Sequence, residues 1–309
     1  METIKIFAPA TVANVSCGFD ALGLAINAVG DEMIFTKTEA KGVTISKIEG
    51  ADLTFDSHKN AAGVVAWTIL KRVQPDFGVD IQLFKKVKPG SGLGSSASSS
   101  AGAAFGVNEL LGKPFSNLEL TEFARLGEQA ACGSPIADNV AAAIYGGFIL
   151  VKSYEPLEIV KLPVPKELWV TVIHPQIEIK TEDARNVLQP TVTVANAVKQ
   201  SANLAGLISG LYTDNYQLIG RSLEDVIAEP YRKKLIPHFD KVKEDGLKAG
   251  ALGAGISGSG PTLFALCQGE KIAEKVAETM KSIYKPTDID FNIHVSKINL
   301  EGCKVISDI

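Results

Sequence analysis

Three glycines at alternate positions, Gly90, Gly92 and Gly94, have the spacing of a loop that could seat an anion. Without a Cβ, glycine adopts positive φ angles and lets the backbone approach a ligand closely. The residues that follow, 95–104, are all Ser, Ala or Gly, so a helix of small side chains can begin directly behind the loop. The unpaired amides of such a loop and of a first helical turn carry partial positive charge. The stretch therefore predicts an anion site, with phosphate as the expected ligand.

The segment before the loop is typical of a strand, because Val79, Ile81, Leu83 and Val87 alternate with polar residues. Strand, glycine loop and helix thus come in the order that a phosphate cradle needs. A flexible Gly/Ser linker is the alternative. Apolar segments flank the loop tightly on both sides, which favours the cradle.

Two well-known phosphate-loop signatures do not match this stretch. No Lys follows Gly94 as in the Walker sequence, and no third glycine completes a dinucleotide fingerprint. The letters PGSGLGSSA resemble the ATP-binding loop of the GHMP small-molecule kinases, named for galactokinase, homoserine kinase, mevalonate kinase and phosphomevalonate kinase. The resemblance implies ATP, with Asn60 near the adenine. The implied loop contacts are Pro89, Gly90, Ser91, Gly92, Leu93, Gly94, Ser95, Ser96, Ala97, Ser98 and Ser99.

A magnesium site is implied by the same resemblance. Ser116 and Glu119 have capping-box spacing and predict the start of a helix that carries Glu128 near its end. In the GHMP pattern, the second loop serine and a Glu about thirty residues later hold the metal, and Ser96 and Glu128 fit that pattern. Hard oxygen ligands suit Mg²⁺. On spacing alone, an exposed glutamate is the alternative.

The N-terminal letters NVSCGFD contain Asn14 and Asp20, which could simply close a turn between two strands. They also resemble a motif of homoserine kinases in which this Asn and Asp hold the amino acid substrate. Two further stretches resemble the same kinases, and there Arg185 and Arg232 meet the substrate carboxylate. Each arginine alone would more often be a surface residue. A forked guanidinium suits a carboxylate, and a carboxylate suits the ammonium of an amino acid.

The letters ADNV place Asp138 and Asn139 together, and both are expected near the acceptor. In mevalonate and galactose kinases an Asp in this region acts as the base, whereas homoserine kinases have Asn, here Asn139. A missing base is tolerable because phosphoryl transfer has a loose transition state. The chain departs from many homoserine kinases at Ile136, where they carry a substrate-holding His.

A second glycine-rich stretch contains Gly253, Gly255 and Gly258, which satisfy G-x-G-x-x-G. A helical pattern precedes it and a strand pattern follows it, the reverse of what a dinucleotide site needs, so an oxidoreductase is disfavoured. The stretch resembles the third GHMP motif, which closes over nucleotide and substrate.

Length and composition predict two domains. The chain has 309 residues, 46% of them hydrophobic and 21% charged, as in an ordinary globular protein. The prolines at 163 and 165 suggest a boundary that gives domains 1–164 and 165–309. The net charge of −4 disfavours nucleic acid or an anionic membrane as a partner. Cations are expected locally at Lys85, Lys86 and Lys88, although such a run is usually a solvated strand end.

The cellular setting follows from weaker signals. Four scattered cysteines suggest neither a zinc site nor a disulfide framework, and favour a reducing compartment. Neither a signal peptide nor an apolar run long enough for a membrane span is evident. We therefore expect a cytoplasmic protein, and the sequence leaves open whether it forms a homodimer.

Together these motifs predict an α+β protein with the two-domain GHMP kinase fold: an N-terminal mixed-sheet domain with the phosphate loop and a C-terminal ferredoxin-like α/β sandwich. The expected reaction is ATP-dependent phosphorylation of the side-chain hydroxyl of L-homoserine, on the way to threonine. The alternatives are another GHMP kinase, of mevalonate or sugar type, and a non-catalytic nucleotide- or anion-binding module.

Overall fold

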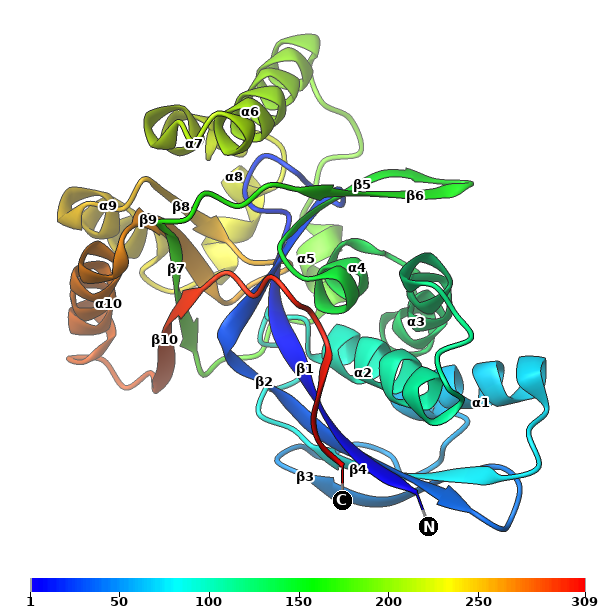
Figure 1. Cartoon of the computed structure of the whole chain (residues 1–309). Coiled ribbons are helices and arrows are strands. Elements are labelled where there is room, and N and C mark those ends of the chain that lie inside the picture. The colour runs from blue at the N-terminus through cyan, green and yellow to red at the C-terminus, as the bar shows by residue number, and fades with distance from the viewer. Residues whose placement is uncertain (1, 309) are drawn as a thin grey trace.

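The computed structural model describes residues 2–308 and contains two sheets (Figure 1). The first is a seven-stranded mixed sheet in the order β11-β1-β2-β4-β3, and β5 joins it on β2 with β6 at its side. β3 and β4 are parallel, whereas the other neighbours are antiparallel. Its strands are β1 (Thr3–Ala13), β2 (Leu22–Thr38), β3 (Val43–Glu49), β4 (Gly78–Phe84), β5 (Phe148–Tyr154), β6 (Leu157–Leu162) and β11 (Lys304–Asp308).

Four helices cover one face of the first sheet: α1 (Ala61–Val73), α2 (Ser95–Leu110), α3 (Asn117–Cys132) and α4 (Asp138–Tyr145). The small residues of α2 let it pack closely on the strands, and a Cβ on Gly102 would lie 2.4 Å from the sulfur of Met33. The predicted capping box at Ser116 and Glu119 starts α3.

The second sheet is antiparallel, in the order β10-β7-β9-β8. Its strands are β7 (Leu168–Pro175), β8 (Gly253–Ile256), β9 (Leu263–Gln268) and β10 (Phe291–Lys297). Between β7 and β8 lie α5 (Thr181–Asn186), α6 (Val194–Tyr212), α7 (Tyr216–Ser222), α8 (Glu229–Arg232), a 3₁₀ turn (Lys233–Leu235) and α9 (Phe239–Ala249), and α10 (Glu270–Tyr284) joins β9 to β10. This β-α-β-β-α-β order confirms the ferredoxin-like sandwich.

The two halves share an apolar core. Val12 and Leu24 of the first sheet pack in one cluster with Val172 and Phe264 of the second. The backbone also crosses between the halves, because β11 pairs with β1. The predicted boundary near residue 164 lies between β6 and β7 and stays a prediction, but the first sheet is completed by a strand from beyond it.

Residues 31–38 form the end of the long strand β2. Val73 is exposed because it occupies the last position of α1. The second glycine-rich stretch opens with the four residues of β8, where Gly253 and Gly255 allow close packing.

Candidate active site

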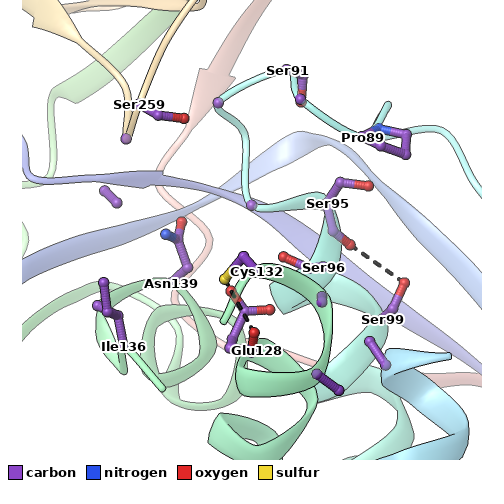
Figure 2. A pocket seen from close by; sticks show the side chains of 18 of the residues that line it. Pro89, Ser91, Ser95, Ser96, Ser99, Glu128, Cys132, Ile136, Asn139 and Ser259 are labelled. Carbon is purple, nitrogen blue, oxygen red and sulfur yellow. Dashed lines mark hydrogen bonds between the residues drawn. The ribbon is translucent and has the colours of Figure 1, made fainter. Parts of the chain in front are cut away.

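A cavity of about 420 Å³ lies where the two halves meet, and the phosphate loop forms one of its walls (Figure 2). Segments far apart in the sequence supply the rest of its lining: the turn after β1, the start of α1, the end of α3, the start of α4, and two arginines from the second half. Residues expected from the sequence in this lining are Asn14, Asp20, Asn60, Pro89, Gly90, Ser91, Gly92, Gly94, Ser95, Ser96, Ser99, Glu128, Asp138, Asn139, Arg185 and Arg232.

The phosphate loop has the backbone that its glycines predicted. Gly90, Gly92 and Gly94 have φ angles of 70°, 79° and 67°, and α2 begins at Ser95. The first intrahelical bond runs from Ser98 N to Gly94 O, at 2.8 Å, which leaves the amides of the first turn free to bind a ligand. The loop and helix therefore have the geometry of an anion site.

The second glycine-rich stretch holds the phosphate loop from the other half. Ser257 Oγ donates to Gly92 O at 2.6 Å, and Thr262 Oγ1 donates to Ser91 O at 2.6 Å. A Cβ on Gly92 would lie 2.7 Å from the carbonyl oxygens of Ser257 and Gly260, so the contact requires glycine. The phosphate loop is therefore packed at Gly92 against the backbone of the second glycine-rich stretch.

Lys85 is a site residue whose role the sequence did not reveal. Its side chain is 1% exposed, unlike the expected solvated strand end. It forms an ion pair with Asp31 and donates to Ser95 O at 2.8 Å and to Ser99 Oγ at 2.9 Å. The alternation of Val79, Ile81 and Leu83 continues to position 85, and this was the signal that could have placed Lys85 inside.

Glu128 and Ser96 face the same space in the cavity (Figure 2). Glu128 is 7% exposed, so the exposed alternative is wrong, and its buried Oε1 has no hydrogen-bond partner among residues 2–308. Burial raises the pKa of Glu128 to about 7, opposed in part by Ser96 and by the charge of Lys85. An orphaned carboxylate oxygen beside a hydroxyl offers the hard oxygen ligands that Mg²⁺ prefers.

Another part of the cavity lining gathers charged groups. Asp20 accepts from Arg185 Nη2, with 3.3 Å to each of its carboxylate oxygens. Arg232 is 4% exposed, and its Nε donates to Ala184 O while its Nη1 donates to Gly258 O. Both guanidiniums therefore face one space, and neither is a free surface residue.

Asn14 links the segment that carries Asp20 to the second glycine-rich stretch. Its Oδ1 accepts from Asp20 N at 3.0 Å, and its Nδ2 donates to Gly258 O at 2.9 Å. Asn14, Val15 and Ser16 all have positive φ angles, which are unfavourable for residues other than glycine. Asn14 and Asp20 therefore close the connection between β1 and β2, and this strained left-handed turn also places Asp20 in the lining of the cavity.

Asp138 and Asn139 open α4 beside these groups. Burial, and after it the negative charge of Asp20, raise the pKa of Asp138 to about 7. Asn139 Oδ1 accepts from Thr11 Oγ1 at 2.6 Å, and Asn139 Nδ2 donates to Asp138 Oδ1 at 3.2 Å. Thr11 was missed by the sequence reasoning, because its contact spans 128 residues of chain.

Ile136, at the place where many homoserine kinases carry His, also lines the cavity. Asn60 lines it too, yet its side chain is engaged within the chain: Oδ1 caps α1 by accepting from Ala62 N, and Nδ2 donates to Thr54 O. The adenine contact of Asn60 stays a prediction.

Comparisons with known proteins agree with this arrangement. Residues 60–147 match the GHMP kinases N terminal domain, and residues 206–286 match the GHMP kinases C terminal domain. A homoserine kinase of Chlorobium phaeovibrioides is 42% identical, with 99% of this chain and 100% of that protein covered. A homoserine kinase of Pyrococcus abyssi is 40% identical, with 95% and 96% covered.

Among solved structures, a homoserine kinase from Cytophaga hutchinsonii is 47% identical, with a TM-score of 0.96 and 99% of this chain and 98% of that chain covered. The chain therefore belongs to the GHMP kinases, in their homoserine kinase family. It is a kinase, and ATP is its phosphoryl donor. No helix within residues 2–308 is long and apolar enough to cross a membrane.

Proposed function

We propose that this kinase transfers the γ-phosphoryl group of ATP to the side-chain hydroxyl of L-homoserine, forming O-phospho-L-homoserine for threonine synthesis. The observation that carries the proposal is the pairing of a phosphate-loop wall with a cluster of Asp20, Arg185 and Arg232 in one cavity. An amino acid is a zwitterion, and this cluster offers a carboxylate and two guanidiniums. Mevalonate or a sugar has no ammonium for Asp20 to bind.

The Asp20–Arg185 ion pair could be replaced by contacts with the substrate. The Asp20–Arg185 pair is long, at 3.3 Å, and each side chain is 35% exposed, so the pair itself is weak. A bound amino acid would separate this pair. Its ammonium would bind Asp20, and its carboxylate would bind Arg185. Arg232, fixed by Ala184 O and Gly258 O, would hold the carboxylate from the buried side.

The part of the cavity beside the phosphate loop would stabilise the charge of the ATP phosphates electrostatically. The loop amides and the first turn of α2 would bind the phosphates. Ser96 and Glu128 would hold Mg²⁺, which neutralises developing charge on the transferred group. Asn139 would orient the acceptor hydroxyl through Nδ2, since its carbonyl oxygen is bound to Thr11. An amide cannot take up the proton, and a loose transition state makes early proton removal unnecessary.

The setting that we infer for this reaction is the cytoplasm. Cys17, Cys267 and Cys303 are free and buried, and Cys132 is free and exposed, which suits a reducing compartment.

A coupled assay of ADP release tests the proposal, with homoserine, mevalonate and galactose as separate acceptors. We expect turnover with homoserine alone. Turnover with mevalonate or galactose and none with homoserine would assign the protein to another kinase of the family, and ATP binding without transfer to any acceptor would favour a binding module.

A further inference from the structure

The hydroxyl of Tyr154, at the end of β5, joins two segments that line the cavity. It donates to Asp20 O at 3.0 Å and accepts from Ala137 N at 3.3 Å. Ala137 immediately precedes α4, whose first two residues are Asp138 and Asn139. One side chain therefore links the segment that presents Asp20 to the segment that presents Asn139.

The ring of Tyr154 is held in place from α3. The guanidinium of Arg125 lies 5.3 Å from the ring centroid, and its Nε donates to Pro135 O at 2.9 Å. Residues 134–137 form no regular secondary structure, and no side chain of their own caps the start of α4. Burial raises the pKa of Tyr154 above its ordinary value, so the hydroxyl stays protonated and can donate at neutral pH.

The neighbouring backbone does not depend on this hydroxyl. Val151 N donates to Ala21 O at 2.8 Å, so β5 already holds the residue after Asp20. Loss of the hydroxyl alone would leave the sheet and the core intact. It would free the carbonyl of Asp20 and the amide of Ala137 to move relative to each other.

We propose that Tyr154 is a positioning residue that sets the spacing between Asp20 and Asn139, and so between the sites for the ammonium and the reacting hydroxyl of the amino acid. The proposal rests on the proposed function, because it assigns the two segments to two ends of one acceptor. The hydroxyl of Tyr154 also binds the amide of Ala137, the residue after Ile136. In this chain, which has no imidazole at position 136, the hydroxyl would hold this segment of the cavity lining in place.

The test is the variant Tyr154→Phe, which keeps the ring against Arg125 and removes only the hydroxyl. The KM for homoserine should rise by roughly fivefold to tenfold, the usual effect of losing a hydrogen bond. The KM for ATP should change by less than about twofold, since the hydroxyl of Tyr154 is bonded to Asp20 and Ala137 and not to the phosphate loop. The matched control is Tyr145→Phe, a half-buried tyrosine on α4 whose hydroxyl makes no hydrogen bond within the described chain, and its kinetic constants should match the wild type.

A double-mutant cycle with Asp20→Asn separates positioning from general loosening. If Tyr154 acts through Asp20, Tyr154→Phe should raise the homoserine KM less in the Asp20→Asn background than in the wild type. Equal effects in both backgrounds, an unchanged homoserine KM in Tyr154→Phe, or an equal rise in the KM for ATP would overturn the proposal. Wild-type protein in the same assay distinguishes the failures: absence of homoserine turnover there would refute the proposed function and this inference together, whereas normal wild-type turnover confines the failure to Tyr154.

Discussion

Replacing Lys85 by methionine should destabilise the protein far more than replacing its neighbour Lys86. Lys85 and Asp31 form an ion pair with both side chains 1% exposed, and Asp31 Oδ1 also accepts from the amides of Lys86 and Val87. In Lys85→Met the carboxylate of Asp31 would stay buried with two backbone donors and no cation. Removing one partner of a buried pair costs about 3–5 kcal/mol of unfolding free energy.

Lys86→Met is the matched control, because Lys86 pairs with Glu32 while 58% of its side chain is exposed. Such surface pairs contribute less than about 1 kcal/mol. Urea-induced unfolding measures both variants. The double variant Asp31→Asn, Lys85→Met removes the uncompensated charge, so it should cost less than the sum of its single changes.

The variant Lys85→Met should also weaken ATP binding. Lys85 donates to Ser95 O and Ser99 Oγ, which fixes the first turn of α2 behind the phosphate loop. The KM for ATP is therefore expected to rise in Lys85→Met and to stay near wild type in Lys86→Met. Equal stability losses for the two lysine variants would refute the reasoning, since burial would then not distinguish them.

The remaining predictions concern the cavity. Ser96→Ala and Glu128→Gln should each lower turnover by roughly tenfold or more while the protein stays folded, and near-normal turnover would contradict the metal role. Because the pKa of Glu128 is raised from 4.5 to about 7, the free energy of unfolding without metal should fall as pH rises through that range. Glu128→Gln should lessen this fall, to which the raised pKa of Asp138 still contributes, and should melt at a higher temperature than the wild type at pH 8. Arg232→Leu should chiefly raise the KM for homoserine, and a collapse of ATP affinity instead would mean that Arg232 is misassigned. Thr262→Val should raise the KM for ATP, because its hydroxyl donates to Ser91 O in the phosphate loop, and an unchanged value would show that the loop holds its shape without this contact.

Local signals in the sequence were sufficient for much of the fold. The positive φ angles of the loop glycines, the start of α2 and the capping box at Ser116 depend on residues close together in the chain. Such features follow from backbone freedom and capping, which a short stretch of sequence determines. The ferredoxin-like order was implied by the resemblance to the GHMP kinases, and the helix and strand patterns near the end of the sequence agreed with an α+β sandwich.

The contacts that complete the site could not be predicted in this way. The bond from Thr11 to Asn139 and the bond from Tyr154 to Asp20 each join residues more than a hundred positions apart. Neither residue type has a motif of its own, so only the folded chain shows what each contacts. Asn60 lies in the cavity and its side chain caps α1, which the resemblance did not reveal, and its adenine contact stays a prediction.

The pairing of β11 with β1 has a consequence for synthesis on the ribosome. Ile4 lies opposite Asp308 in this pairing, and Figure 1 shows the last strand, in red, running beside β1, in blue. Because β1 precedes β11 by almost three hundred residues, the backbone groups on that edge of β1 stay without their partner until β11 has been synthesised. During that interval β1 presents an unpaired edge to other nascent chains, and such edges favour aggregation.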